Sequence, residues 1–118
     1  MATRIDLDQA ALEIARRAEA WRANGLVVEA PTWRDIGEPW PYPLKVNRTD
    51  VKHADSLGVA VRKDTQEGSV VLFDGGWADL LYWDGTTDKL VDEAPGWDDW
   101  LNIEAFANLL DRFARMFT

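Results

Sequence analysis

The chain has 118 residues, of which 47% are aliphatic or aromatic and 29% are charged, a composition that suits one folded domain and excludes a disordered polar segment. It has no cysteine, which excludes disulfides and thiolate chemistry, and its one histidine, His53, leaves little for a transition-metal site. The net charge of -8 argues against direct binding to nucleic acid or anionic lipid, because both present a negatively charged surface.

The first predicted element is an amphipathic helix that Asp6 or Asp8 could cap and that ends at Asn24 and Gly25. Its apolar residues recur at spacings of three and four, and they are Leu7, Ala11, Ile14, Ala18 and Trp21. The same stretch lacks the apolar run of a signal peptide, and no segment approaches the roughly 18 apolar residues of a membrane span. We therefore expect a cytoplasmic protein.

A short strand is expected over residues 26–30, and a packed loop over 31–43, where four prolines disfavour any regular element. Trp33 and Trp40 are expected to pin this loop. Weak alternation over 44–48 and clearer alternation over 57–63 then predict strands, and residues 64–68 resemble a turn.

The clearest local signal is a hairpin, with strands at 69–73 and 77–83 joined by a turn at 74–76. Alternation in the second strand places on one face Trp77, Asp79, Leu81 and Trp83. A turn at Asp84 and Gly85 leads to a weaker strand at 89–91.

The last predicted element is a second amphipathic helix over 103–117, with Asn102 as its cap. The order is helix, strand, loop, antiparallel strands and helix. It predicts a single α+β domain, residues 1–118, in which an antiparallel sheet of about four to six strands carries both terminal helices on one face.

The acidic residues are concentrated in one segment. Residues 74–104 contain nine acids and a single base, Lys89, and so carry the whole net charge, together with four of the seven tryptophans. A tryptophan beside carboxylates suits a protein partner with a basic cleft, because the ring can be buried while the acids steer association. The candidate partner-binding residues are Asp79, Trp83, Asp84, Asp88, Trp97, Asp98, Asp99 and Trp100.

The loop that holds Trp97 and Trp100 leaves two interpretations open. Either its rings are exposed and bind the partner, or Trp100, alone or together with Trp97, folds back to cap the sheet. In the second case Asp98 and Asp99 only mark the approach to the last helix.

No catalytic residue, cofactor or metal site is predicted. His53 lies in a polar stretch near Ser56, and neighbours in sequence do not make a catalytic triad. Asp74 and Asp79 flank the hairpin turn and could act as acid and base, although aspartate is common at turns for conformational reasons. The acids of 84–99 do not match the spacing of a calcium-binding loop.

A family resemblance adds a function to this interpretation. It lies in the segments AWRANG at 20–25, LVVE at 26–29, LGVAV at 57–61 and VLFDGGWADL at 71–80, followed by the closing helix. In this order of elements the chain resembles the small acidic immunity proteins of bacterial polymorphic toxin systems, in particular the TriTu-type partners of ADP-ribosyltransferase toxins that modify elongation factor Tu. The resemblance implies a monomeric inhibitor in interbacterial competition, including type VI secretion, that occludes the toxin's basic active-site cleft.

Two other functions stay open. One is an adaptor or phage-type inhibitor that mimics nucleic acid; such a mimic should spread its acids at phosphate-like intervals, whereas these crowd around loops with tryptophan. The other is a small hydrolase that uses the carboxylates of Asp74 and Asp79.

Overall fold

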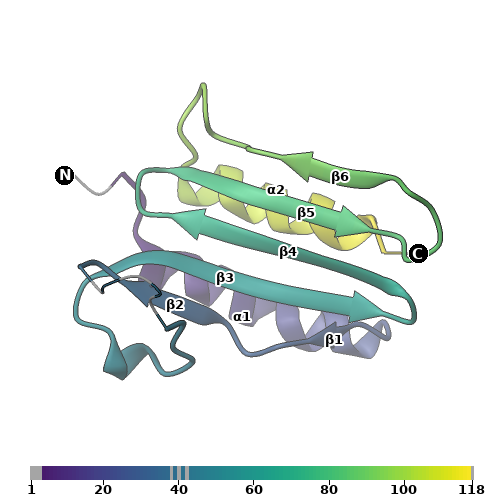
Figure 1. The fold of residues 1–118 in the computed structure, drawn as a ribbon, viewed down its shortest axis with the longest axis horizontal. Helices are drawn as coiled ribbons and strands as arrows, with labels where there is room; N and C mark the ends of the chain where they lie inside the picture. The colour runs from purple at the N-terminus through teal and green to yellow at the C-terminus, as the bar shows by residue number, and fades with distance from the viewer. Residues whose placement is uncertain (1–3, 38, 40, 42, 118) are drawn as a thin grey trace.

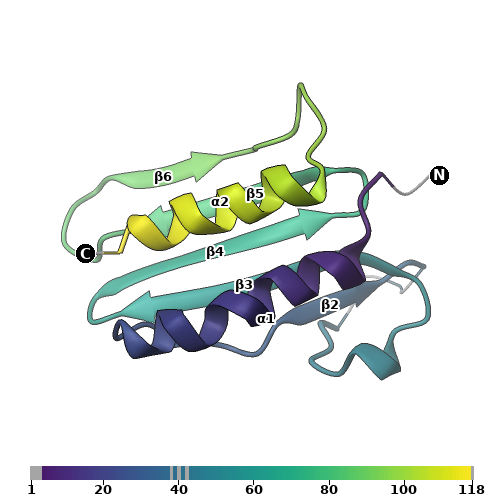
Figure 2. The same cartoon turned by 180° about the vertical axis from the view of Figure 1, so that it is seen from behind.

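Both helices lie on one face of an antiparallel sheet, so the fold is α+β (Figures 1 and 2). The computed structural model describes residues 4–37, 39, 41 and 43–117. Within them the helices are α1 (Leu7–Ala23) and α2 (Ile103–Arg115), and a 3-10 turn, η1, spans Arg48–Asp50. The prediction of two terminal helices on one face of the sheet is confirmed.

The sheet of the described residues has six strands, in the order β1-β3-β4-β5-β6, with β2 also paired to β3. Their bounds are β1 (Val27–Val28), β2 (Thr32–Asp35), β3 (Ala54–Lys63), β4 (Gln66–Phe73), β5 (Trp77–Trp83) and β6 (Leu90–Glu93). Every pairing is antiparallel. The predicted hairpin is confirmed as β4 and β5, with Phe73 opposite Trp77.

Both helix caps follow from the sequence. The Asp6 carboxylate accepts hydrogen bonds from the backbone N–H groups of Asp8 and Gln9, at 2.9 and 3.2 Å. The Asn102 side chain accepts one from the Ala105 N–H at 2.7 Å. Each cap satisfies backbone donors that the first helical turn leaves without a partner.

The proline-rich stretch contains a strand, β2, so the prediction of a loop without regular structure was wrong there. Trp33 lies opposite Leu57 of β3, is buried, and exchanges backbone hydrogen bonds of 2.7 and 2.9 Å with Lys45. The prolines do not prevent this pairing, because one precedes β2 and three follow it. The strand expected over 44–48 is reduced to this bridge at Lys45. Trp40 lies outside the described residues.

Gly68 lies within β4, whereas the sequence predicted a turn over 64–68. A Cβ atom at this position would lie 2.8 Å from the Leu81 carbonyl oxygen and 2.9 Å from Cε1 of Phe113. The missing side chain lets α2 pack closely on the sheet, so the glycine serves packing rather than a turn.

The hydrophobic core lies between the sheet and the two helices. Its most deeply buried side chains are Ile14, Leu57, Val59, Val61, Val70, Leu72, Leu80, Phe106, Leu110 and Phe113. The strand residues among them alternate along β3, β4 and β5, which places them on the face that the helices cover.

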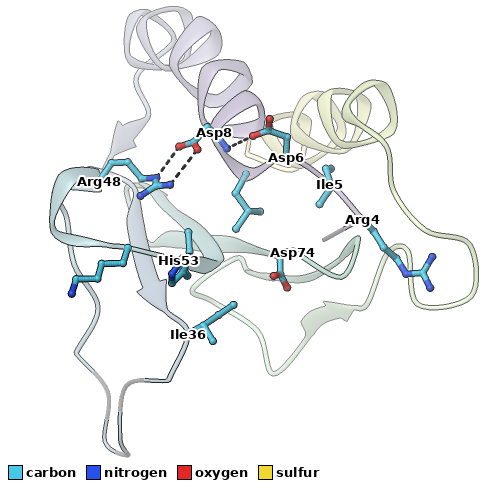
Figure 3. A pocket seen from close by; sticks show the side chains of 11 residues that line it. Arg4, Ile5, Asp6, Asp8, Ile36, Arg48, His53 and Asp74 are labelled. Carbon is cyan, nitrogen blue, oxygen red and sulfur yellow. Dashed lines mark hydrogen bonds and ion pairs between the residues drawn. The ribbon is translucent and has the colours of Figure 1, made fainter. Parts of the chain in front are cut away.

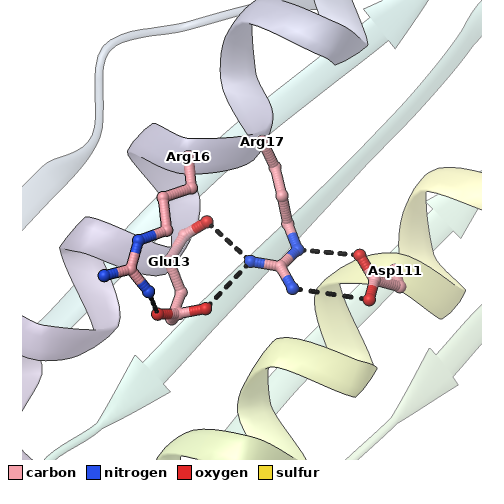
Figure 4. A network of polar contacts seen from close by, with 4 residues as sticks. All are labelled: Glu13, Arg16, Arg17 and Asp111. Atoms are coloured by element: carbon pink, nitrogen blue, oxygen red, sulfur yellow. Dashed lines mark hydrogen bonds and ion pairs between the residues drawn. The ribbon is translucent and has the colours of Figure 1, made fainter.

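A polar network joins the two helices (Figure 4). The Arg17 guanidinium of α1 donates to both carboxylate oxygens of Asp111 in α2, at 2.7 and 3.4 Å. It also donates to Glu13, whose carboxylate pairs in addition with Arg16. The Arg17 hydrogen bond holds the pKa of the Asp111 carboxyl below its usual value.

Candidate functional site: the open face of the sheet

The helices leave the other face of the sheet uncovered, and this face points toward the viewer in Figure 1. It presents the side chains of β5 that alternate away from the core, as the sequence predicted. We call Trp77, Asp79, Leu81 and Trp83 the β5 stripe. The open face consists of the β5 stripe and of the residues that strand register places beside it. These neighbours are Ala60, Arg62, Glu67, Ser69, Val71, Phe73, Leu90 and Asp92.

One end of the β5 stripe is an aromatic cluster. The ring of Trp77 stacks on Phe73 with centroids 4.4 Å apart, and Trp97 meets Trp77 edge-on at 5.1 Å. Trp97 nevertheless keeps 60% of its surface exposed. Such a ring offers a large apolar contact whose position is already fixed by its neighbours.

The loop that carries Trp97 is attached to the start of β5. The Ala78 N–H donates to the Pro95 carbonyl at 2.9 Å, and the Leu101 N–H donates to the Gly76 carbonyl at 2.7 Å. Trp100 is 48% exposed, with the Arg4 guanidinium 4.5 Å from its ring centroid. Neither Trp97 nor Trp100 is buried under the sheet, which favours the exposed interpretation of this loop.

The opposite end of the stripe is a turn held by hydrogen bonds. The indole N–H of Trp83 donates to the Thr87 carbonyl at 2.7 Å. The Asp84 carboxylate accepts from the backbone N–H groups of Thr86 and Thr87, at 2.9 and 3.0 Å, and these bonds lower the pKa of Asp84. Asp88 is exposed in the same turn.

Between β3 and β6 the open face is hollowed into a shallow groove of about 290 Å³. Small side chains, Ala60 and Ser69, lie beside larger apolar ones, and this difference in size creates the depression. The apolar groove residues are Leu81, Trp83 and Leu90, which are 37%, 38% and 56% exposed.

The predicted partner-binding residues thus lie at both ends of one strand. Trp97, Asp98, Asp99 and Trp100 lie near its start, Trp83, Asp84 and Asp88 near its end, and Asp79 between them. Trp77, Leu81 and Leu90 connect the two ends, and none of them was among the predicted partner-binding residues. The period-2 alternation of β5 was the signal that could have included Trp77 and Leu81.

The carboxylates around this face lack cationic partners. In the described part of the chain no ion pair involves Asp79, Asp84, Asp88, Asp92, Asp98 or Asp99. Among the described residues, Glu93 is the one carboxylate of the acidic segment that forms an ion pair, with Arg112 of α2 at 2.8 Å. The negative charge is therefore available to a binding partner.

A second concave site lies at the start of α1, a cleft of about 650 Å³ (Figure 3). It brings His53 near Asp74, which are far apart in the sequence, but the imidazole has no hydrogen bond to any described residue. Burial, and then the charge of Asp55, raises the pKa of Asp74. The Arg48 guanidinium in this cleft is already bound to Asp8, at 2.8 and 3.2 Å.

The two aspartates considered for hydrolysis do not share a site. Asp74 lines the cleft at α1, whereas Asp79 lies on the open face and is not among the cleft residues. Among the described residues no group of three or more His, Asp or Glu side chains is placed to hold a metal ion. Neither of the described helices has the length and apolar character needed to cross a bilayer.

Comparison of the chain with protein-family models, with curated proteins and with solved structures finds no match.

Proposed function

We propose that this protein is an immunity protein, a stoichiometric inhibitor that binds a bacterial toxin domain in the cytoplasm and occludes the basic cleft of its active site. The observation that carries the proposal is the open face, where exposed aromatic and aliphatic side chains lie among carboxylates that have no ion-pair partner in the described residues. Such an inhibitor needs no catalytic group of its own. The toxin class that the family resemblance suggests is an ADP-ribosyltransferase.

The open face combines aromatic side chains that can anchor a protein partner with charges that can steer its approach. Rigid tryptophan rings are the side chains that most often dominate the binding energy of protein interfaces. Unpaired carboxylates around them accelerate encounter with a basic surface, and nucleotide-binding or RNA-binding clefts are basic. The open face supplies both properties on one rigid sheet.

The size of the face also suits a protein partner. The eight residues of β4 span about 27 Å, and the four spacings from β1 to β6 span about 19 Å. A face of these dimensions supplies the larger part of one side of a standard interface, about 800 Å².

The test is co-expression with the C-terminal domain encoded by the open reading frame immediately upstream. We expect this protein to restore growth of cells that produce the domain and to co-purify with it in a 1:1 complex. The matched pair of variants is Leu81→Arg on the open face and Leu12→Arg on α1, because both leucines are exposed. Only Leu81→Arg should abolish rescue.

Failure of the wild-type chain both to rescue growth and to bind that domain would count decisively against the proposal. Rescue without a complex would instead indicate that the protein acts on the toxin's product or target, which favours an enzyme. Equal loss of rescue in both arginine variants would place the contact outside the open face.

A further inference from the structure

The β5 stripe carries one charge in the middle of an apolar row. Asp79 lies between Trp77 and Leu81 along the strand, and Val71 lies directly opposite it on β4. Its side chain is exposed and forms no hydrogen bond or ion pair with any described residue. Neither the fold nor a neighbouring side chain therefore requires a carboxylate here.

This position has a consequence for any partner. A surface that covers Trp77 and Leu81 also covers the residue between them, and so removes water from the Asp79 carboxylate. Burial of an unpaired carboxylate opposes binding strongly, whereas burial against a cation with good geometry is compensated. The partner must then bring a cationic group to this point, and arginine suits it best because its planar guanidinium also packs on aromatic rings.

A second copy of the chain is a poor occupant of the same face. A two-fold contact centred on Asp79 would bring the Asp79 carboxylates of the two copies together, and Arg62, the arginine among the open-face residues, is already paired with Glu29 at 3.4 Å. Like charges facing each other in an interface oppose association, so the same aspartate that selects a cationic partner disfavours self-association.

We propose that Asp79 determines which partner the open face accepts, by requiring an arginine or lysine side chain of the toxin domain between the contacts to Trp77 and Leu81. The inference rests on the proposed function for the identity of the partner. It adds the chemistry of the central contact and a reason for the chain to remain monomeric without its partner.

The first arm of the test measures binding of the upstream-encoded toxin domain by calorimetry. Asp79→Asn keeps the shape of the side chain and removes its charge, so we expect the dissociation constant to rise by about thirtyfold or more. Glu19→Gln is the matched control, because Glu19 is exposed on α1 and outside every ion pair of the described residues. It should bind like wild type.

The second arm needs no partner. Asp79→Leu makes the stripe apolar without interruption, so this variant should self-associate in sedimentation velocity while wild type and Glu19→Leu stay monomeric. Adding Leu81→Arg to Asp79→Leu should restore the monomer. Circular dichroism and urea unfolding establish that each variant is folded.

The outcomes separate the two proposals. If the domain binds wild type and Asp79→Asn equally well, the role of Asp79 is overturned and the inhibitor function stands. If the domain neither binds nor is neutralised, the inhibitor function fails and the contact of Asp79 with a toxin side chain fails with it. The second arm then decides only whether Asp79 keeps the chain monomeric. A monomeric Asp79→Leu variant, or wild type that dimerises through this face, overturns the inference.

Discussion

Large apolar side chains are buried on one face of the sheet and partly exposed on the other. On the covered face, Leu72 has essentially no exposed surface, and neither has Phe113 of α2, which packs against this face. On the open face, Trp83 and Leu81 retain more than a third of theirs, although they lie on the same strand as the buried Leu80. One strand thus contributes to folding with one set of side chains and offers the other set to a partner.

The carboxylates of the two regions differ in whether they form ion pairs. Several carboxylates on or beside the helices are matched with arginine, as in Asp111 with Arg17 and Glu93 with Arg112, although Glu19 of α1 is not. Those at the open face and its two end loops are not matched within the described residues. Since exposed ion pairs add little stability, the unmatched acids cost the fold little and remain free to steer a partner.

The largest effect is expected in the core between the covered face and the helices, from Phe113→Ala of α2. Phe113 is fully buried and contacts Trp21 and Phe117 edge-on, with centroids 6.3 and 5.4 Å away. Its truncation should lower the free energy of unfolding by roughly 3 to 5 kcal/mol. Urea unfolding followed by circular dichroism measures this change.

The folded fraction of Phe113→Ala should still bind the toxin domain with wild-type affinity. Leu12→Ala on the exposed surface of α1 is the control, with a change in unfolding free energy within about 0.5 kcal/mol. A loss of affinity beyond the loss of folded protein would contradict the division of roles between the two faces.

The opposite pattern is expected from Trp83→Ala and Trp97→Ala. Each should weaken binding by about 2 kcal/mol or more, because aromatic anchors dominate interfaces, and should lower the stability by about 1 kcal/mol. Calorimetry and urea unfolding on the same samples separate the two effects. If only one variant loses affinity, the interface is confined to that end of β5.

A smaller effect is expected from the charges of the 97–100 loop. Asp98→Lys combined with Asp99→Lys should slow association with the toxin domain by about tenfold at low ionic strength, with little change in the dissociation rate. The difference should vanish near 1 M salt, where the Debye length falls to about 3 Å. Stopped-flow measurements of association at several salt concentrations provide the check. A wild-type rate that does not depend on salt would remove steering from the mechanism.

The fold was largely predictable because its signals are local. The alternation of β5, the caps Asp6 and Asn102 and the turn after Phe73 each depend on a few consecutive residues. The strand β2 was not predictable in this way, since the burial of Trp33 depends on a distant partner, Leu57.

The candidate site was predictable only in part. Composition identified the acidic segment and its tryptophans, but the sequence alone did not show that Trp97 meets Trp77 or that the helices leave this face uncovered. Which of two alternating faces is covered depends on how the helices pack, and that is a property of the whole chain.

The smallest effect is expected from the ion pair between the helices, and it depends on pH. The folded state lowers the pKa of Asp111, so the pair stabilises the protein above the usual aspartate pKa, near 3.9, and this contribution is lost as the pH falls through the lower, folded-state value. Because the Asp111 side chain is 45% exposed, solvent screening limits the contribution to about 0.5 to 1 kcal/mol. Comparison with Asp111→Asn isolates it, since other groups, including Asp74 with its raised pKa, titrate alike in both proteins. Urea unfolding from pH 6 down to about pH 2.5 should show the two stabilities converging as the aspartate becomes protonated. A difference that stays constant over this range would mean that Asp111 contributes through packing rather than charge.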